Sequence, residues 1–91
     1  MTYLDNLIVE LEKELTDRYG LMLPSRVLWK VLGYSSPDAW RQSIRRGTIP
    51  IPIFQLPGRS GYFGLSRDVA TLMAKARLKA EQPKQGNISC E

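Results

Sequence analysis

The chain has 91 residues, which is enough for one small domain but not for two separate hydrophobic cores. Hydrophobic residues make up 43% of the chain and charged residues 24%, a composition typical of soluble globular proteins. It contains no run of 18 apolar residues, and its acidic start does not resemble an export signal. We therefore expect a cytoplasmic protein without a membrane partner.

The residue types also exclude several kinds of site. Cys90 is the single cysteine and there is no histidine, so the sequence predicts neither an internal disulfide nor a zinc site. No nucleophile has a base beside it and no pair of carboxylates has catalytic spacing, so we expect no enzyme activity, metal or cofactor. Gly58, Gly61 and Gly64 superficially resemble a phosphate-binding loop, but no Lys-Ser/Thr pair follows them and the expected context is a hairpin, so we expect no nucleotide binding.

The positive charge is concentrated in the middle of the chain. The net charge is +4, but residues 21–80 hold ten basic and two acidic residues, whereas residues 1–20 hold five acidic and two basic ones. Such a region suits a polyanion, because contacts with phosphates release condensed counterions. A solubilising surface is the alternative interpretation, and the clustering of the bases favours nucleic acid.

Residues 2–19 predict an amphipathic helix. Thr2 is a suitable N-cap, Asp5 is its capping-box partner, and Gly20 follows as a helix-ending residue. Apolar residues recur at helical spacing and form one stripe. This stripe either packs on the chain's own domain or also builds a dimer, because small domains gain from oligomerisation and operators are often read by twofold dimers. The candidate oligomerisation residues are Leu4, Leu7, Ile8, Leu11 and Leu15.

Residues 24–46 predict a helix-turn-helix, preceded by a buried connection at residues 21–23. The first helix begins at Pro24 or Ser25, because proline is tolerated in a first turn and serine can act as a cap. It runs to about residue 32, and Gly33 ends it.

The second helix of the pair spans residues 36–46 and has the clearest start signal in the chain. Ser36 is an N-cap, Pro37 occupies the first helical position, and Gly47 closes the helix. Trp40 and Ile44 lie four residues apart and are predicted to face the core, while the arginines and the glutamine face away.

The hydrophobic period changes to two after residue 47. Isoleucines alternate with prolines there, a pattern that predicts a two-stranded wing at residues 48–65 with its turn at residues 57–61. Ser66 is expected to cap a last helix at residues 66–79. Residues 81–91 are polar and without periodicity, so we expect a disordered tail. The predicted apolar side of the last helix contains Val69, Leu72, Met73 and Ala76.

These elements predict one mainly helical α+β domain at residues 1–80. Its class is a winged helix-turn-helix with a two-stranded wing and an extra N-terminal helix. In that class the second helix enters the major groove and the wing contacts the minor groove or the backbone. Arginine pairs with guanine and glutamine with adenine, so Arg41, Gln42 and Arg45 are candidate base readers. The candidate phosphate and wing contacts are Arg26, Ser36, Arg46, Arg59 and Ser60.

The order of motifs over residues 22–78 resembles the pyocin activator family of transcriptional regulators. It is similar, more loosely, to the excisionase and MerR-type winged helix-turn-helix group of phages and plasmids. The N-terminal leucine-rich helix is not part of the core excisionase module. The resemblance implies a DNA-binding protein of bacterial, phage or plasmid origin without catalytic activity. The motifs of this chain that carry the resemblance are Leu23-Pro24, Gly33, Ser36-Pro37-Asp38-Ala39-Trp40, Arg46-Gly47, Ile49, Ile51-Pro52 and Ser66-Arg67-Asp68-Val69-Ala70.

The sequence thus predicts a transcriptional regulator that binds duplex DNA as a homodimer or a higher homo-oligomer. One alternative is an excisionase-like recombination directionality factor, which shares the fold. The other is an adaptor that uses the fold to bind a protein. For these functions, integrase or RNA polymerase would be a further partner.

Overall fold

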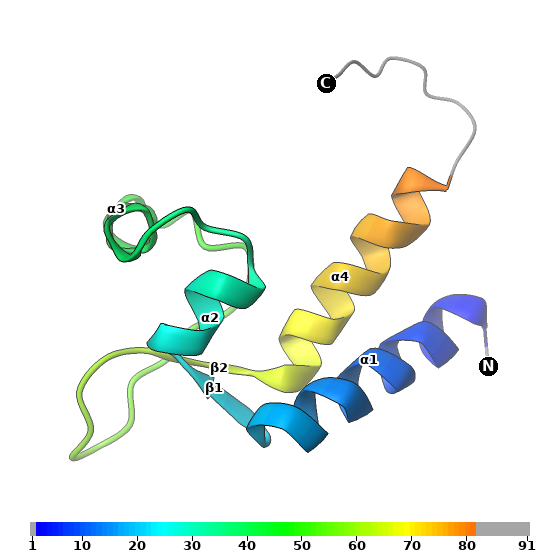
Figure 1. Ribbon diagram of the computed structural model, residues 1–91, viewed down its shortest axis with the longest axis horizontal. Coiled ribbons are helices and arrows are strands. Elements are labelled where there is room, and N and C mark those ends of the chain that lie inside the picture. Colours follow the sequence, from blue (N-terminus) through cyan, green and yellow to red (C-terminus); the bar gives the residue numbers. More distant parts are fainter. Residues whose placement is uncertain (1, 82–91) are drawn as a thin grey trace.

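Four helices and one two-stranded antiparallel sheet form the fold in the computed structural model, which describes residues 2–81 (Figure 1). It is a small, mainly helical α+β protein. Helices α1 and α4 lie side by side, α2 and α3 lie away from them, and the sheet joins the two pairs (Figure 1). The elements are α1 (Tyr3–Tyr19), β1 (Met22–Pro24), α2 (Ser25–Val31), α3 (Pro37–Arg46), β2 (Phe63–Leu65) and α4 (Ser66–Ala80).

Helix α1 begins and ends where its capping residues predict. The Thr2 hydroxyl accepts from the Asp5 N–H at 3.1 Å, and the Thr2 N–H donates to the Asp5 carboxylate at 3.4 Å, which completes the capping box. Gly20 ends the helix with a φ of 92°. The helix packs along α4, and Leu15, with 7% of its surface exposed, joins the core.

The sheet differs from the predicted wing. Strand β2 pairs with β1, a segment that the sequence predicted as a connection, and places Leu23 opposite Gly64. Residues 48–56 form no strand, and a single bridge between Phe54 and Phe63 is all that joins them to β2. Both segments contain proline, twice among residues 48–56 and once, as Pro24, in β1, so the missing N–H does not select between them. Strand β1 differs in that it brings the fully buried Leu23 to the core.

The core lies where the sheet, α2, α3 and α4 meet. Its most deeply buried side chains are Leu23, Leu28 and Val69, none of which is exposed. A long loop, residues 47–62, connects α3 to β2. Trp40 of α3 and Ile51 of this loop are 3% and 6% exposed and belong to the same cluster. The loop isoleucine thus packs as a core residue without belonging to a strand.

Helix α4 corrects two predictions. Ser66 is not its cap: the residue is 1% exposed, Leu65 holds the N-cap position, and the Ser66 hydroxyl donates to the Gly20 carbonyl at 2.7 Å. Ala76 is exposed, whereas Ala74, like Ala70, is fully buried. The helix ends at residue 80, and the predicted disordered tail lies outside the described residues except for residue 81.

Candidate nucleic-acid interface

Helix α3 forms as its sequence predicts. The Ser36 hydroxyl accepts from the Ala39 N–H at 3.1 Å, Pro37 occupies the first turn, and Gly47 closes the helix with a φ of 69°. Trp40 faces the core, while the arginine and glutamine side chains are exposed. The helix therefore presents a polar, cationic face on an anchored scaffold.

A cluster of hydroxyl groups fixes the inner side of α3. The Ser43 hydroxyl lies 3.0 Å from the Tyr34 hydroxyl and 2.6 Å from the Thr48 hydroxyl. The Tyr34 ring also meets Trp40 edge-on, with ring centres 5.5 Å apart. Only 8% of Ser43 is exposed, so this polar side chain is buried and hydrogen-bonded to its partners. These contacts tie the middle and the C-terminal half of α3 to Tyr34, which precedes the helix, and to Thr48, which follows it.

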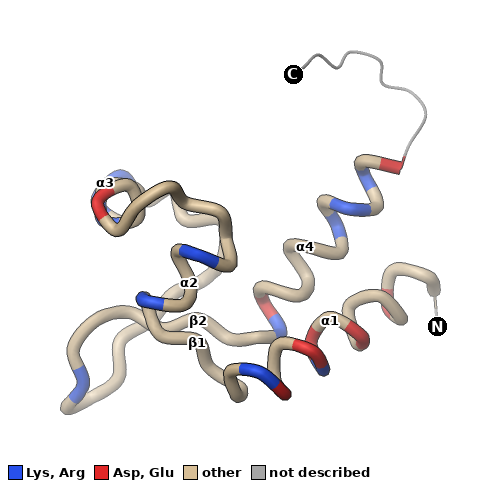
Figure 2. The backbone as a smooth tube through the Cα atoms, viewed as in Figure 1, with Lys and Arg blue, Asp and Glu red and all other residues tan. Residues whose placement is uncertain are grey.

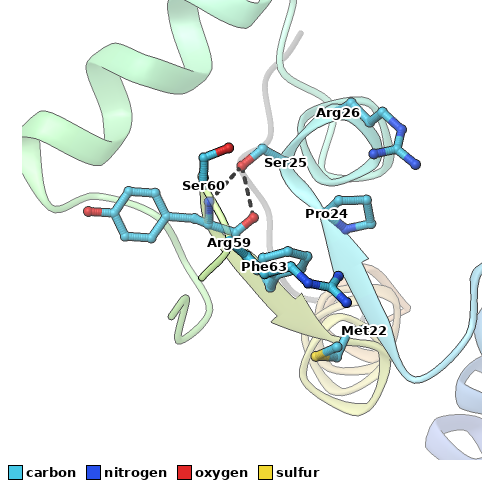
Figure 3. Close-up of a pocket in the computed structure, with 9 residues that line it drawn as sticks. Met22, Pro24, Ser25, Arg26, Arg59, Ser60 and Phe63 are labelled. Carbon is cyan, nitrogen blue, oxygen red and sulfur yellow. Dashed lines mark hydrogen bonds between the residues drawn. The ribbon is translucent and has the colours of Figure 1, made fainter. Parts of the chain in front are cut away.

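Two hollows lie on this side of the molecule, one of them against α3. The first, the inner hollow, has a volume of about 380 Å³ and lies between α3 and the end of the long loop. The second, the outer hollow, has a volume of about 490 Å³ and lies among β1, the start of α2 and the loop (Figure 3). Ser25, Gly61 and Tyr62 line both. Arg41 and Arg45 line the inner hollow, and Arg26 and Arg59 line the outer one.

The contact between Ser25 and Tyr62 separates the hollows. The Ser25 hydroxyl donates to the Tyr62 carbonyl at 2.9 Å and accepts from the Tyr62 N–H at 3.3 Å (Figure 3). Gly61, beside this contact, has a φ of 83°, which side-chain-bearing residues rarely adopt. The sequence suggested Ser25 only as a helix cap, because nothing local marks its partner 37 residues away. The contact ties the loop to α2 and so sets the position of its tip.

Basic side chains outnumber acidic ones around the two hollows. No aspartate or glutamate lines either hollow. Within residues 2–81, no ion pair engages Arg26, Arg45 or Arg59, whereas Arg41 pairs with Asp38 one turn earlier on α3. Most of the acidic residues lie on α1, whereas α2 carries none and α3 carries only Asp38 (Figure 2). Uncompensated cations on a concave surface favour an anionic ligand.

The predicted DNA-contacting residues separate into groups. Arg41 and Arg45 meet at the inner hollow; Arg26, Arg59 and Ser60 meet at the outer one. Gln42 and Arg46 are exposed on α3 and line neither hollow. The Ser36 hydroxyl oxygen is engaged as a helix cap, and its hydrogen has no acceptor among the described residues.

The predicted oligomerisation stripe of α1 packs at least in part within its own domain. Leu15 is buried, and Ile8 and Leu11 contact the core cluster. Leu4 and Leu7, in the N-terminal half of the helix, are half-buried. These two leucines, unlike Ile8 and Leu11, do not pack against the core cluster, which makes them the candidates for contact with a second chain.

No family model, curated protein or solved structure matches this chain. Within residues 2–81 no helix is both long enough and apolar enough to cross a bilayer. The same residues contain no cluster of three acidic or cysteine side chains that could hold a metal ion.

Proposed function

We propose that this protein binds duplex DNA in a sequence-specific way and regulates transcription. Helix α3 enters the major groove, and loop residues 57–61 contact the neighbouring minor groove or backbone. The observation that carries the proposal is the pair of adjoining hollows, lined by four arginines and no carboxylate. The resemblance to pyocin activator regulators supports the same function.

On this proposal the solvent-exposed face of α3 contacts the edges of the bases. Arg41 and Arg45 lie one turn apart, as required for contact with successive base pairs from one helix face, and each guanidinium can pair with guanine O6 and N7. To contact a base, Arg41 must first break its ion pair with Asp38. That step costs little, because both side chains are more than half exposed and exposed ion pairs contribute at most about 1 kcal/mol. Gln42 completes the base-reading set, and Arg46 contacts phosphate.

The proposed assembly is a homodimer or a higher homo-oligomer. The half-buried Leu4 and Leu7 of α1 are its candidate contacts, because their side chains are only partly covered by the protein's own domain. A twofold dimer would read an inverted repeat, whereas an excisionase-like protein would occupy direct repeats. The arrangement of sites recovered by selection from random duplexes therefore separates these two functions.

The test measures binding of the full chain to selected duplexes and to random duplexes over a range of salt concentrations. We expect the affinity for both to fall steeply with salt, because each phosphate contact releases a counterion. Arg45→Ala should cost about 1–3 kcal/mol at its cognate base pair and relax specificity there.

Arg18→Ala is the matched control. It removes the same charge from an exposed position of α1, where the arginine lies 3.9 Å from Glu14, and should leave specificity unchanged. If the wild-type protein does not bind duplex DNA at low salt, or binds without a steep salt dependence, the proposed function is wrong.

A further inference from the structure

The loop between Phe54 and Phe63 has a cationic hollow on each side of its root. The inner hollow is bounded by Arg41 and Arg45 of α3, and the outer one by Arg26 at the start of α2 and Arg59 of the loop. The two adjoin across the hydrogen bonds between Ser25 and Tyr62. The tip of the loop projects beyond the helices (Figure 1).

The two strands that flank the minor groove of a DNA duplex match the arrangement of the two hollows on either side of the loop. A loop that enters a minor groove, about 6 Å wide, has one sugar–phosphate strand on each side. With α3 in the adjacent major groove, one of these strands must pass between α3 and the loop, where the inner hollow lies. The other strand, across the minor groove, must pass on the opposite side of the loop, where the outer hollow lies.

We propose that the outer hollow is a backbone site that binds this far strand, so that the protein straddles one minor groove. The proposal rests on the function proposed above and assigns a separate role to the outer hollow. Arg26 and Arg59 each neutralise one phosphate of this strand there. The apolar floor of Met22, Pro24 and Phe63 contacts deoxyribose rather than base edges, so the site adds affinity without sequence information.

The experiment uses neutral methylphosphonate linkages, placed one at a time on both strands of a duplex obtained by selection. For the wild-type protein we expect two groups of sensitive phosphates that face each other across one minor groove. Arg26→Ala and Arg59→Ala should each lower the slope of log affinity against log salt by about 0.9. Both variants should lose sensitivity to the far-strand linkages and keep sensitivity to those between α3 and the loop.

Two further variants control for charge and for folding. Lys30→Ala removes an exposed cation of the same helix that does not line the outer hollow, and should leave the far-strand pattern unchanged. Arg26→Lys keeps the charge and should retain most of the salt slope. Circular dichroism of each variant confirms that α2 is intact.

The outcomes separate this inference from the proposed function. If the far-strand linkages weaken the Arg26→Ala protein as much as the wild type, the outer hollow is not a backbone site. The same holds if Arg26→Ala and Arg59→Ala both leave DNA binding unchanged, a result that would point to an acidic protein segment as its ligand. In either case, a loss of sequence specificity in the Arg45→Ala protein would still support the proposed binding of duplex DNA. If the wild type binds no duplex, both proposals fail.

Discussion

Gly64 lies in β2 at a point where the sheet leaves no room for a side chain. A Cβ built on it would lie 2.9 Å from Ile51 Cδ1 and 3.3 Å from both δ-methyl groups of Leu28. Carbon atoms prefer about 3.5–4.0 Å, and Leu28 is fully buried, so it cannot swing into solvent. Gly64→Ala should therefore overpack the core where β2 meets β1.

The expected loss of stability in the Gly64→Ala protein is the difference between two opposing free-energy terms. Overpacking of this kind costs about 1–3 kcal/mol. Alanine regains about 0.5–1 kcal/mol, because it restricts the unfolded chain more than glycine does. The middle of each range predicts that the free energy of unfolding of the Gly64→Ala protein falls by about 1.3 kcal/mol, with an upper limit of about 2.5 kcal/mol. The central value corresponds to a decrease in Tm of about 5–10 °C for a domain of this size. Urea denaturation followed by circular dichroism measures the first quantity, and calorimetry measures the second.

A second substitution tests whether the contact itself is the cause. Ile51→Val removes the nearest methyl group and alone should cost about 0.5–1.5 kcal/mol. Combined with Gly64→Ala it should cost at least about 0.5 kcal/mol less than the sum of the two single changes. Gly58→Ala, where nothing lies within 4 Å of the added carbon, should show no such coupling to Ile51→Val. Additive behaviour of Gly64→Ala and Ile51→Val would refute the proposed packing of β2.

Three other changes test the interface, the sheet and the assembly. Asp38→Asn removes a carboxylate from the exposed face of α3 and frees Arg41, so fluorescence anisotropy should show tighter binding to random duplexes; unchanged binding would place this face away from DNA. Ser66→Ala leaves the Gly20 carbonyl without its 2.7 Å donor and should cost about 1–3 kcal/mol in urea denaturation, unless water reaches that site. Leu7→Asp should reduce a wild-type oligomer to the 10.4 kDa chain in light scattering, and a mass unaltered from the wild type would exclude this helix as the interface.

Local signals determined the helices because their information lies within a few residues. The capping box of Thr2 and Asp5 begins α1 where expected, and Ser36, Pro37 and Gly47 delimit α3. The exposure of the α3 arginines also follows from periodicity, because Trp40 determines which side of the helix is buried.

The hollows that make up the candidate site could not be predicted in this way. Their shared boundary is the contact of Ser25 with Tyr62, and the buried position of Ser43 depends on Tyr34 and Thr48. A serine in the sequence looks the same whether it caps a helix, faces water or ties a loop to a distant helix. Only the packed chain shows which of these it does.

The sequence by itself determined four helices, the side of α3 that faces solvent and the concentration of positive charge after residue 20. The tertiary structure decided that β2 pairs with residues 22–24 rather than with the proline-rich segment, and that Ile51 enters the core from a loop. Helix signals are local, whereas strand pairing depends on which distant segment offers an apolar side chain at the right place in the core, as Leu23 of β1 does. That pairing brings the start of α2 beside the loop and thereby creates the outer hollow between Arg26 and Arg59.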